Sequence, residues 1–305
     1  AELRALARGG LSPSSLVSYD GAGFSLSLQN QLARFSYHTS CFGLRAGPYG
    51  VTQLGGFYTA VGNFLDTQHP VKTKADADAY LARLEAVPGL LDADTEIVRA
   101  NTAMGVIAPR FILDQAIMQL GKFRDGDVRS KTLVPSIGDR AGALGLAGYG
   151  DRAARIFEGP IRAAATRQID VLTGLLDRAG PTGVTKLPDG EAYYAAVLRL
   201  HTTTGMSAAE IHKIGLEQVA DLNSRIDALL TAQGFTKGTM TERRDALAAA
   251  PGQIFANDDK GRAELLAYLN GRLDAIKTRL PQVFNRMPTL PYEIRRVPPE
   301  VEGGA

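Results

Sequence analysis

The side chains best suited to chemistry lie close together in one segment, GEAYYAAVLRLHTTTG, which begins at Gly190. The segment combines phenol, guanidinium and hydroxyl groups, which are the donors and acceptors that hold polar ligands. One interpretation is that these groups face a cleft and bind a ligand. The other is that the threonine hydroxyls end a helix and satisfy free backbone groups. The candidate binding residues are Tyr193, Tyr194, Arg199, Thr202, Thr203 and Thr204.

A zinc site is the second kind of chemistry to consider. Hydrolytic zinc sites commonly place two histidines four residues apart on a helix, with a glutamate beside the first. His201 and His212 flank a turn near Glu210 and Glu217, so a site built from them stays open. A packing role for His201 and a surface position for His212 are favoured, and we assign no metal ligand. No two of the four histidines are four residues apart: they are His38, His69, His201 and His212.

Motifs for nucleophilic or phosphate chemistry are missing from the sequence, so we assign no catalytic residue. There is neither a G-x-S-x-G elbow nor an S-x-x-K motif. Cys41 follows His38 by three residues, but Cys–His pairs are built in space and an unreactive thiol is favoured. A glycine series has neither the order of a dinucleotide fingerprint nor a phosphate-loop lysine, so a flexible loop is favoured there. Its members are Gly142, Gly145, Gly148 and Gly150.

Composition and charge narrow the class of protein. The 305 residues carry 34 basic and 32 acidic side chains, a formal charge of +2, and 45% of them are hydrophobic. These values are typical of a globular protein and give no electrostatic case for binding nucleic acid or an anionic membrane. No run of about 18 apolar residues is present, which excludes a membrane-spanning helix. The first residues, AELRALARGG, do not form a signal peptide, which is compatible with a processed form or a fragment.

Apolar residues recur at helical spacing along most of the chain. We therefore expect helices to position the candidate residues. We expect a break at Pro88-Gly89 and a kink at Pro160, and residues 122–150 lose the periodicity. Ser207 and Glu210 form a capping box that opens a long helix. We expect helices over residues 12–38, 51–66, 73–87, 90–104, 109–120, 151–179, 191–201, 207–233 and 259–280.

The long helix after Ser207 has one apolar face, which we expect to pack on another helix. That face comprises Ile211, Gly215, Val219, Leu222, Ile226 and Leu229. Only the tail, LPYEIRRVPP, indicates a strand, with Tyr292, Ile294 and Arg296 on one side. The predicted fold is therefore all-α, mainly long antiparallel helices, with a short β element near the C-terminus. We expect one helical region over 1–305, with a sub-boundary near 122–150 or 180–189.

The segment LPDGEAYYAAVLRLHTTTGMSAAEIHKIGLEQVADL resembles the signature of the bacterial DUF885 family. In that family a G-[EK]-x-Y-Y segment and a threonine triplet precede a capped helix. Other stretches resemble the family in the same order, so the resemblance is collinear along nearly the whole chain. These are LSPSSLVSYD, TQHPVKTKADADAYLARLEAVPGLLD, APRFILDQAIMQL and LPQVFNRMPTLPYEIRRVPPEV.

The resemblance implies a mainly helical zinc metallopeptidase with a deep cleft. The family's zinc motif, His-Glu-x-x-Gly-His-His with a later glutamate, lies downstream of the segment that ends this chain at VEGGA. The resemblance therefore implies that this chain is the N-terminal, cleft-forming part of such an enzyme. Zinc would belong to the complete protein, with its ligands on a C-terminal part or a second chain, and the substrate would be a peptide. Such a half is expected to expose a broad apolar surface.

The tail segment YEIRRVP is a candidate edge strand against which an extended peptide aligns. Arg295 and Arg296 would then meet substrate carboxylates, although a charged, solvated strand edge is the favoured interpretation. The alternative for the whole chain is a non-catalytic helical binding or scaffold protein that shares the ancestry. An independent enzyme with another site is a third possibility. Many members of the family carry export signals, so a periplasmic and a cytoplasmic location both stay open.

Overall fold

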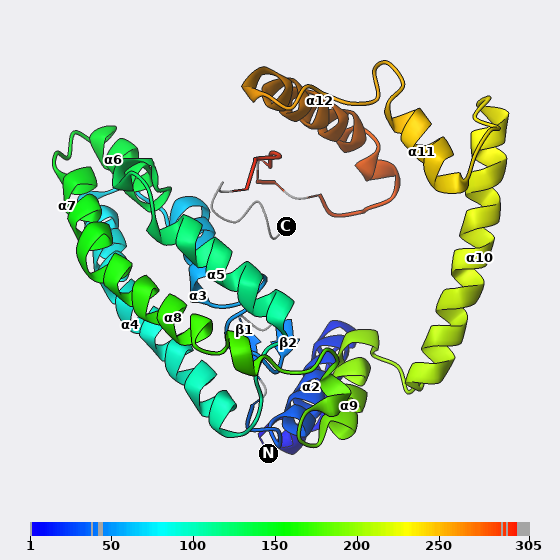
Figure 1. Cartoon of the computed structure of the whole chain (residues 1–305), viewed down its shortest axis with the longest axis horizontal. Coiled ribbons are helices and arrows are strands. Elements are labelled where there is room, and N and C mark those ends of the chain that lie inside the picture. Colours follow the sequence, from blue (N-terminus) through cyan, green and yellow to red (C-terminus); the bar gives the residue numbers. More distant parts are fainter. Residues whose placement is uncertain (1, 38, 42–44, 288, 291, 298–305) are drawn as a thin grey trace. The chain divides into compact units, whose positions relative to one another are not determined.

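A computed structural model describes the chain except for residues 1, 38, 42–44, 288, 291 and 298–305 (Figure 1). Its architecture is all-α, as predicted, apart from a small antiparallel hairpin of β1 (Thr39–Cys41) and β2 (Arg45–Gly47). The chain divides into two compact units. Unit 1 contains the residues up to Gly205, and unit 2 comprises Met206–Val297.

Unit 1 is built from helices that pack around one large hydrophobic core and a smaller aromatic cluster. The 12–38, 109–120 and 191–201 helices are confirmed with shifted ends, whereas the 51–66 segment is a short helix followed by a π-helical stretch. The elements are α1 (Glu2–Ala5), α2 (Pro13–Leu32), α3 (Phe57–Asn63), η2 (Phe64–Gln68), α4 (Lys74–Ala103), α5 (Arg110–Arg124), α6 (Leu133–Gly142), α7 (Tyr149–Ile156), η4 (Phe157–Ile161), α8 (Arg162–Thr173) and α9 (Gly190–Thr202).

Helix α4 is continuous over 30 residues, so the expected break at Pro88-Gly89 is wrong. Thr73 opens the helix through a capping box with Asp76. Proline inside a helix costs about 3 kcal/mol because it removes one backbone hydrogen bond and clashes with the preceding turn. The helix persists because its buried side chains, on both sides of Pro88, outweigh that cost. They are Ala77, Tyr80, Leu81, Leu84, Val87, Leu91, Thr95, Val98 and Asn101.

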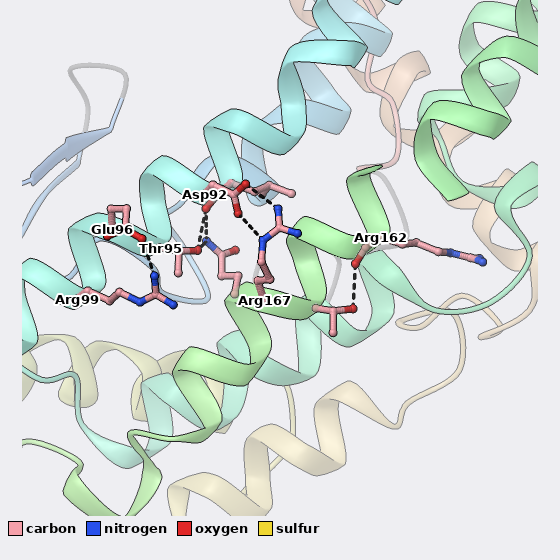
Figure 2. Close-up of polar contacts among 9 residues, drawn as sticks. Asp92, Thr95, Glu96, Arg99, Arg162 and Arg167 are labelled. Carbon is pink, nitrogen blue, oxygen red and sulfur yellow. Dashed lines mark hydrogen bonds and ion pairs between the residues drawn. The ribbon is translucent and has the colours of Figure 1, made fainter. Parts of the chain in front are cut away.

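Helix α8 lies beside α4 and is joined to it by a buried and an exposed polar contact (Figure 2). The fully buried Gln168 amide donates to the Leu91 carbonyl at 3.1 Å and to the Thr95 hydroxyl at 3.2 Å. At the surface, Arg167 donates to both oxygens of Asp92, at 3.0 and 2.6 Å. The paired geometry fixes how the two helices lie along each other, while burial supplies most of the stability.

The stretch 122–150, expected to be irregular, contains helix α6, which packs closely on α7. Its glycines serve this packing. Gly145 and Gly148 have positive φ angles in the connecting turn, and Gly138 meets Gly150 where the helices cross. We expected a kink at Pro160. At this position the structure has a π-helical stretch, η4, which joins α7 to α8. Both segments proposed as sub-boundaries, 122–150 and 180–189, lie inside unit 1.

Unit 2 contains α10 (Ala208–Ala232), α11 (Met240–Ala248) and α12 (Asp259–Lys277). The capping box of Ser207 and Glu210 is confirmed at the start of α10. Arg243 of α11 is buried and joins α11 to α10, donating to the Asp227 carboxylate, the Thr231 hydroxyl at 2.9 Å and the Phe235 carbonyl at 2.5 Å. This single side chain thus provides a hydrogen-bond donor for the Phe235 carbonyl in the turn between the two helices and links that turn to α10.

The expected strand in the tail is not formed among the described residues 292–297. A strand requires a neighbouring strand to complete its hydrogen bonds. Here the Asn270 side chain takes that place at Ile294, accepting from its N–H at 2.9 Å and donating to its carbonyl at 3.2 Å. The C-terminal β element of the predicted fold is therefore corrected to an unpaired segment beside α12.

Replacing Gly138 by valine should destabilise unit 1, because a Cβ there would lie 3.4 Å from the Gly150 Cα. We expect the free energy of unfolding to fall by about 1–3 kcal/mol, the usual cost of an overpacked contact. Gly142→Val is the matched control, since the space around Gly142 in the same helix is open. It should change the stability by less than about 1 kcal/mol. Urea unfolding measures both variants, and equal losses would contradict the close helix crossing.

Candidate functional site

Helix α9 carries most of the predicted binding residues and is held in unit 1 by an aromatic cluster. Tyr193 is 1% exposed, and its ring centroid lies 5.2 Å from those of Phe35 and Tyr37. The Tyr37 hydroxyl donates to the Pro188 carbonyl at 2.6 Å, immediately before α9. Burial raises the pKa of Tyr193, and the nearby Tyr37 raises it further, so the phenol stays neutral. Tyr193 therefore positions α9 from within the core.

The exposed side of α9 presents different groups from its buried side. Tyr194 is 38% exposed, and Arg199 and His201 are also exposed. Tyr194 and His201 are two helical turns apart and share one side, whereas Arg199 is rotated about 140° from Tyr194. The structure thus separates the two predicted tyrosines, one into the core and one onto the surface, and does not gather the predicted residues on one face.

The threonine triplet forms a tight turn that ends α9. The Thr202 hydroxyl donates to the Leu198 carbonyl at 2.8 Å and accepts from the Thr204 N–H at 3.3 Å. The Thr202 and Thr204 hydroxyls lie 3.1 Å apart. These contacts give Thr202 and Thr204 the helix-ending role that was one of the two interpretations.

Thr203 differs from its neighbours because its backbone is strained and its side chain is exposed. Its φ of 56° and ψ of 16° lie in the left-handed region, where glycine is the usual residue at a helix C-terminus. A β-branched residue in this conformation costs about 1–2 kcal/mol. Backbone strain of this kind is concentrated at functional sites, so Thr203 is the strongest candidate of the triplet for contacting a ligand.

Arg295 and Arg296 belong to unit 2, in the tail beside α12. Arg295 donates to the Glu293 carboxylate, and both of these side chains are exposed. Nearby, the Lys277 ammonium lies 4.4 Å from the centre of the Tyr292 ring. The tail therefore presents charged groups next to aromatic and apolar ones.

No group of three His, Cys, Asp or Glu side chains able to hold a metal ion occurs in the part of the chain that the structure describes. His201 lies in unit 1 and His212 in unit 2, and both are exposed. His38 and the Cys41 side chain lie outside the described residues and side chains. The described residues therefore do not fit a zinc site.

His69 has a structural role that the sequence did not reveal. It is buried, and its Nε2 lies 2.9 Å from the Asp76 carbonyl while Arg83 donates to its Nδ1. The Asp76 carbonyl accepts and the Arg83 guanidinium donates, so the ring links these two positions of α4. Arg140 donates to the His69 carbonyl at 2.7 Å and so ties α6 to the end of η2.

A partly buried carboxylate, Asp94, was also missed by the sequence analysis. It lies on α4 and accepts from the Phe57 N–H at 2.5 Å, which anchors the start of α3. Burial raises the pKa of Asp94 to about 6. Asn101, two turns further along α4, donates to the Pro48 carbonyl at 3.0 Å, so α4 holds both ends of the loop 48–57. Only the raised pKa distinguishes Asp94, and sequence spacing carries no signal for it.

The chain belongs to the family described as "Bacterial protein of unknown function (DUF885)", which it matches over residues 1–305. The resemblance read from the segment around the tyrosine pair and the threonine triplet is thereby confirmed at the level of the family.

A solved structure described as "putative lipoprotein from Colwellia psychrerythraea" resembles this fold with a TM-score of 0.75 and 25% sequence identity. The match covers 85% of this chain and 46% of that chain, so this chain spans about half the length of its structural relative. No curated protein matches the sequence significantly. Within the described residues, no helix has the length and apolar character needed to cross a bilayer.

Replacing Asp94 by asparagine should make stability less dependent on pH. The folded-state pKa of about 6 exceeds the ordinary value of 3.8, so the carboxyl destabilises the fold increasingly as pH rises from about 4 to above 6. We expect the advantage of Asp94→Asn in unfolding free energy to grow by about 1–3 kcal/mol between pH 4 and pH 7.5. Asp92→Asn, at an exposed carboxylate paired with Arg167, is the control and should show no such growth. A pH-independent difference for Asp94→Asn would contradict the assigned burial.

Replacing Thr203 by glycine should raise the free energy of unfolding by about 1 kcal/mol, because glycine adopts the left-handed conformation without strain. Thr202→Gly should lower it, because it removes the hydrogen bond to the Leu198 carbonyl from a helical position. Chemical denaturation monitored by circular dichroism measures both. A loss of stability in Thr203→Gly equal to that in Thr202→Gly would contradict the strain assigned to Thr203.

Proposed function

We propose that this chain forms the N-terminal part of a zinc-dependent peptidase and supplies part of the cleft in which a peptide is hydrolysed. On this proposal the zinc ligands and the general base lie on a C-terminal part or on a second chain. Membership of the DUF885 family and the 46% coverage of a longer structural relative support the proposal that the complete protein has a further part beyond this chain. Hydrolysis itself follows from the resemblance and is the part of the proposal that experiment must establish.

The main observation in support of a second part of the protein is that most side chains of unit 2 are exposed to solvent. Among its described residues only Leu230, Arg243 and Gly261 are buried. A helical unit of this size normally encloses a hydrophobic core, because each helix must bury its apolar stripe against another element. Unit 2 therefore presents surface of the kind that other polypeptide covers.

Helix α10 shows this exposure most clearly. The face predicted to pack on another helix is not covered, and Val219, Leu222 and Leu229 are 55%, 48% and 62% exposed. The stripe from Ile211 to Leu229 extends for about 27 Å along one side of the helix. Contiguous apolar surface on this scale marks an interaction site. It supports the proposal that the C-terminal part, or a partner chain, packs here.

In the complete protein, each unit separately offers exposed groups that are candidates for holding a peptide, on α9 in unit 1 and on the tail in unit 2. Tyr194 and Thr203 offer hydroxyl groups, while Arg199, Arg295 and Arg296 offer guanidinium groups for substrate carboxylates. Tyr193, Thr202 and Thr204 act indirectly, because the structure uses them to fix the position and the end of α9.

The test uses the complete protein in which this sequence occurs. We expect about one zinc per molecule by metal analysis, and cleavage of a quenched fluorescent peptide library that a chelator abolishes and zinc restores. The 32.5 kDa chain alone should show neither. Arg199→Ala and Tyr194→Phe should raise KM for peptides severalfold, with Lys213→Ala, on the exposed surface of α10, as the unaffected control.

Two results would overturn the peptidase assignment. One is a complete protein that contains zinc-binding residues but cleaves no peptide in the library. The other is intact-mass spectrometry showing that the native protein is a single 32.5 kDa species without zinc. Either result would favour the alternative, a non-catalytic helical binding or scaffold protein.

A further inference from the structure

Along the tail segment 292–297, α12 holds one main-chain side, and no described residue pairs with the backbone of Glu293 or Arg295 on the other side. The Asn270 amide accepts from the Ile294 N–H at 2.9 Å and donates to the Ile294 carbonyl at 3.2 Å. We propose that the unpaired side binds an extended peptide by strand addition, through the backbone groups of Glu293 and Arg295.

The contacts of the side chains show that the segment is extended. In an extended chain, residues i and i+2 lie on the same face, and the N–H and carbonyl of one residue point to the same side. The ion pair between Glu293 and Arg295 satisfies the first condition, and the double contact of Ile294 with Asn270 satisfies the second. Helical or turn geometry would separate Glu293 from Arg295.

On the opposite edge of the segment, the backbone donors and acceptors of Glu293 and Arg295 have no partner among the described residues. The backbone groups of Glu293 and Arg295 point away from the side that Asn270 occupies. Neither residue forms a backbone hydrogen bond with any part of the chain that the structure describes. Two N–H groups and two carbonyls thus alternate along one edge at the spacing of a β ladder.

An extended peptide is the ligand that complements this edge. Main-chain groups with a two-residue repeat match the backbone of another extended segment, and strand addition obtains its affinity from such groups. The exposed apolar side chains of Tyr292 and Ile294 flank the edge and would contact alternate peptide side chains. In a parallel pairing of two copies, Arg295 and Arg296 would face their own counterparts, and their repulsion disfavours that arrangement.

The inference deepens the proposed function, on which it rests for the identity of the natural peptide as substrate. Binding at this edge requires neither zinc nor hydrolysis. A failure to bind would therefore leave the peptidase proposal standing on its own test, and a failure to hydrolyse would leave peptide binding measurable.

The experiment measures binding of a fluorescein-labelled Thr-Val-Thr-Val-Thr-Val peptide to the chain by anisotropy, with hydrogen exchange of residues 289–297 as the second readout. We expect saturable binding and slower exchange in this segment. Arg295→Pro should weaken binding by about tenfold or more, because proline removes the donor N–H. Arg295→Ala is the matched control: it removes the side chain, retains the N–H and should change the affinity less than about threefold.

A peptide with alternate amides N-methylated keeps the side chains but cannot form a β ladder, and it should bind at least about tenfold more weakly. Equal binding of the methylated and unmethylated peptides would overturn strand addition. So would the absence of saturable binding, or equal effects of Arg295→Pro and Arg295→Ala in a chain whose circular dichroism spectrum is unchanged.

Discussion

Burial of one face of α4 along its whole length is the interaction on which the rest of unit 1 depends. Helices α6, α7 and α8 all contact this helix, and its buried side chains belong to the main hydrophobic core. Burying one Leu or Val contributes about 1.5–3 kcal/mol, so a few such residues exceed the cost of the internal proline. The magnitude of burial thus explains why Pro88 lies inside a helix instead of ending it.

The position of the candidate residues on α9 follows from the same core through a short series of contacts. Asn101 and Asp94 of α4 hold the loop that contains Tyr49. Tyr49 packs against both the main core and the aromatic cluster that buries Tyr193. The strained turn at Thr203 is therefore attached to a helix that is itself fixed at several points. A rigid support of this kind allows a strained residue to persist.

Much of the helical content was predictable because apolar periodicity and capping residues act locally. Ser12, Thr73 and Ser207 each begin a helix where the sequence placed one. Helix α6 was missed because its glycines serve a close crossing with α7, a tertiary reason that local propensity cannot express. The tail strand was predicted wrongly for the same kind of reason, since strand pairing depends on a partner, and Asn270 occupies one side of the tail.

The candidate site was predictable only in part, for a related reason. Residue type indicated that the tyrosine pair and threonine triplet were unusual, but not which side chains would be buried. One residue of helix rotation, about 100°, separates the core position of Tyr193 from the exposed position of Tyr194. Asp94 and His69 acquire their properties from neighbours distant in sequence, so no local pattern identifies them.

Helix α10 does not bury its apolar face as α4 does in unit 1, and its local interactions do not compensate for that missing burial. Isolated helices are marginal in water, and most helical stability in proteins comes from packing of the apolar face. The capping box contributes about 1 kcal/mol, and the exposed pairs Lys213–Glu217 and Asp221–Arg225 a few tenths each, with the first in the less favourable orientation. Ordering twenty-five residues costs more conformational entropy than so small a local gain offsets, so a surface that covered the apolar stripe would stabilise α10.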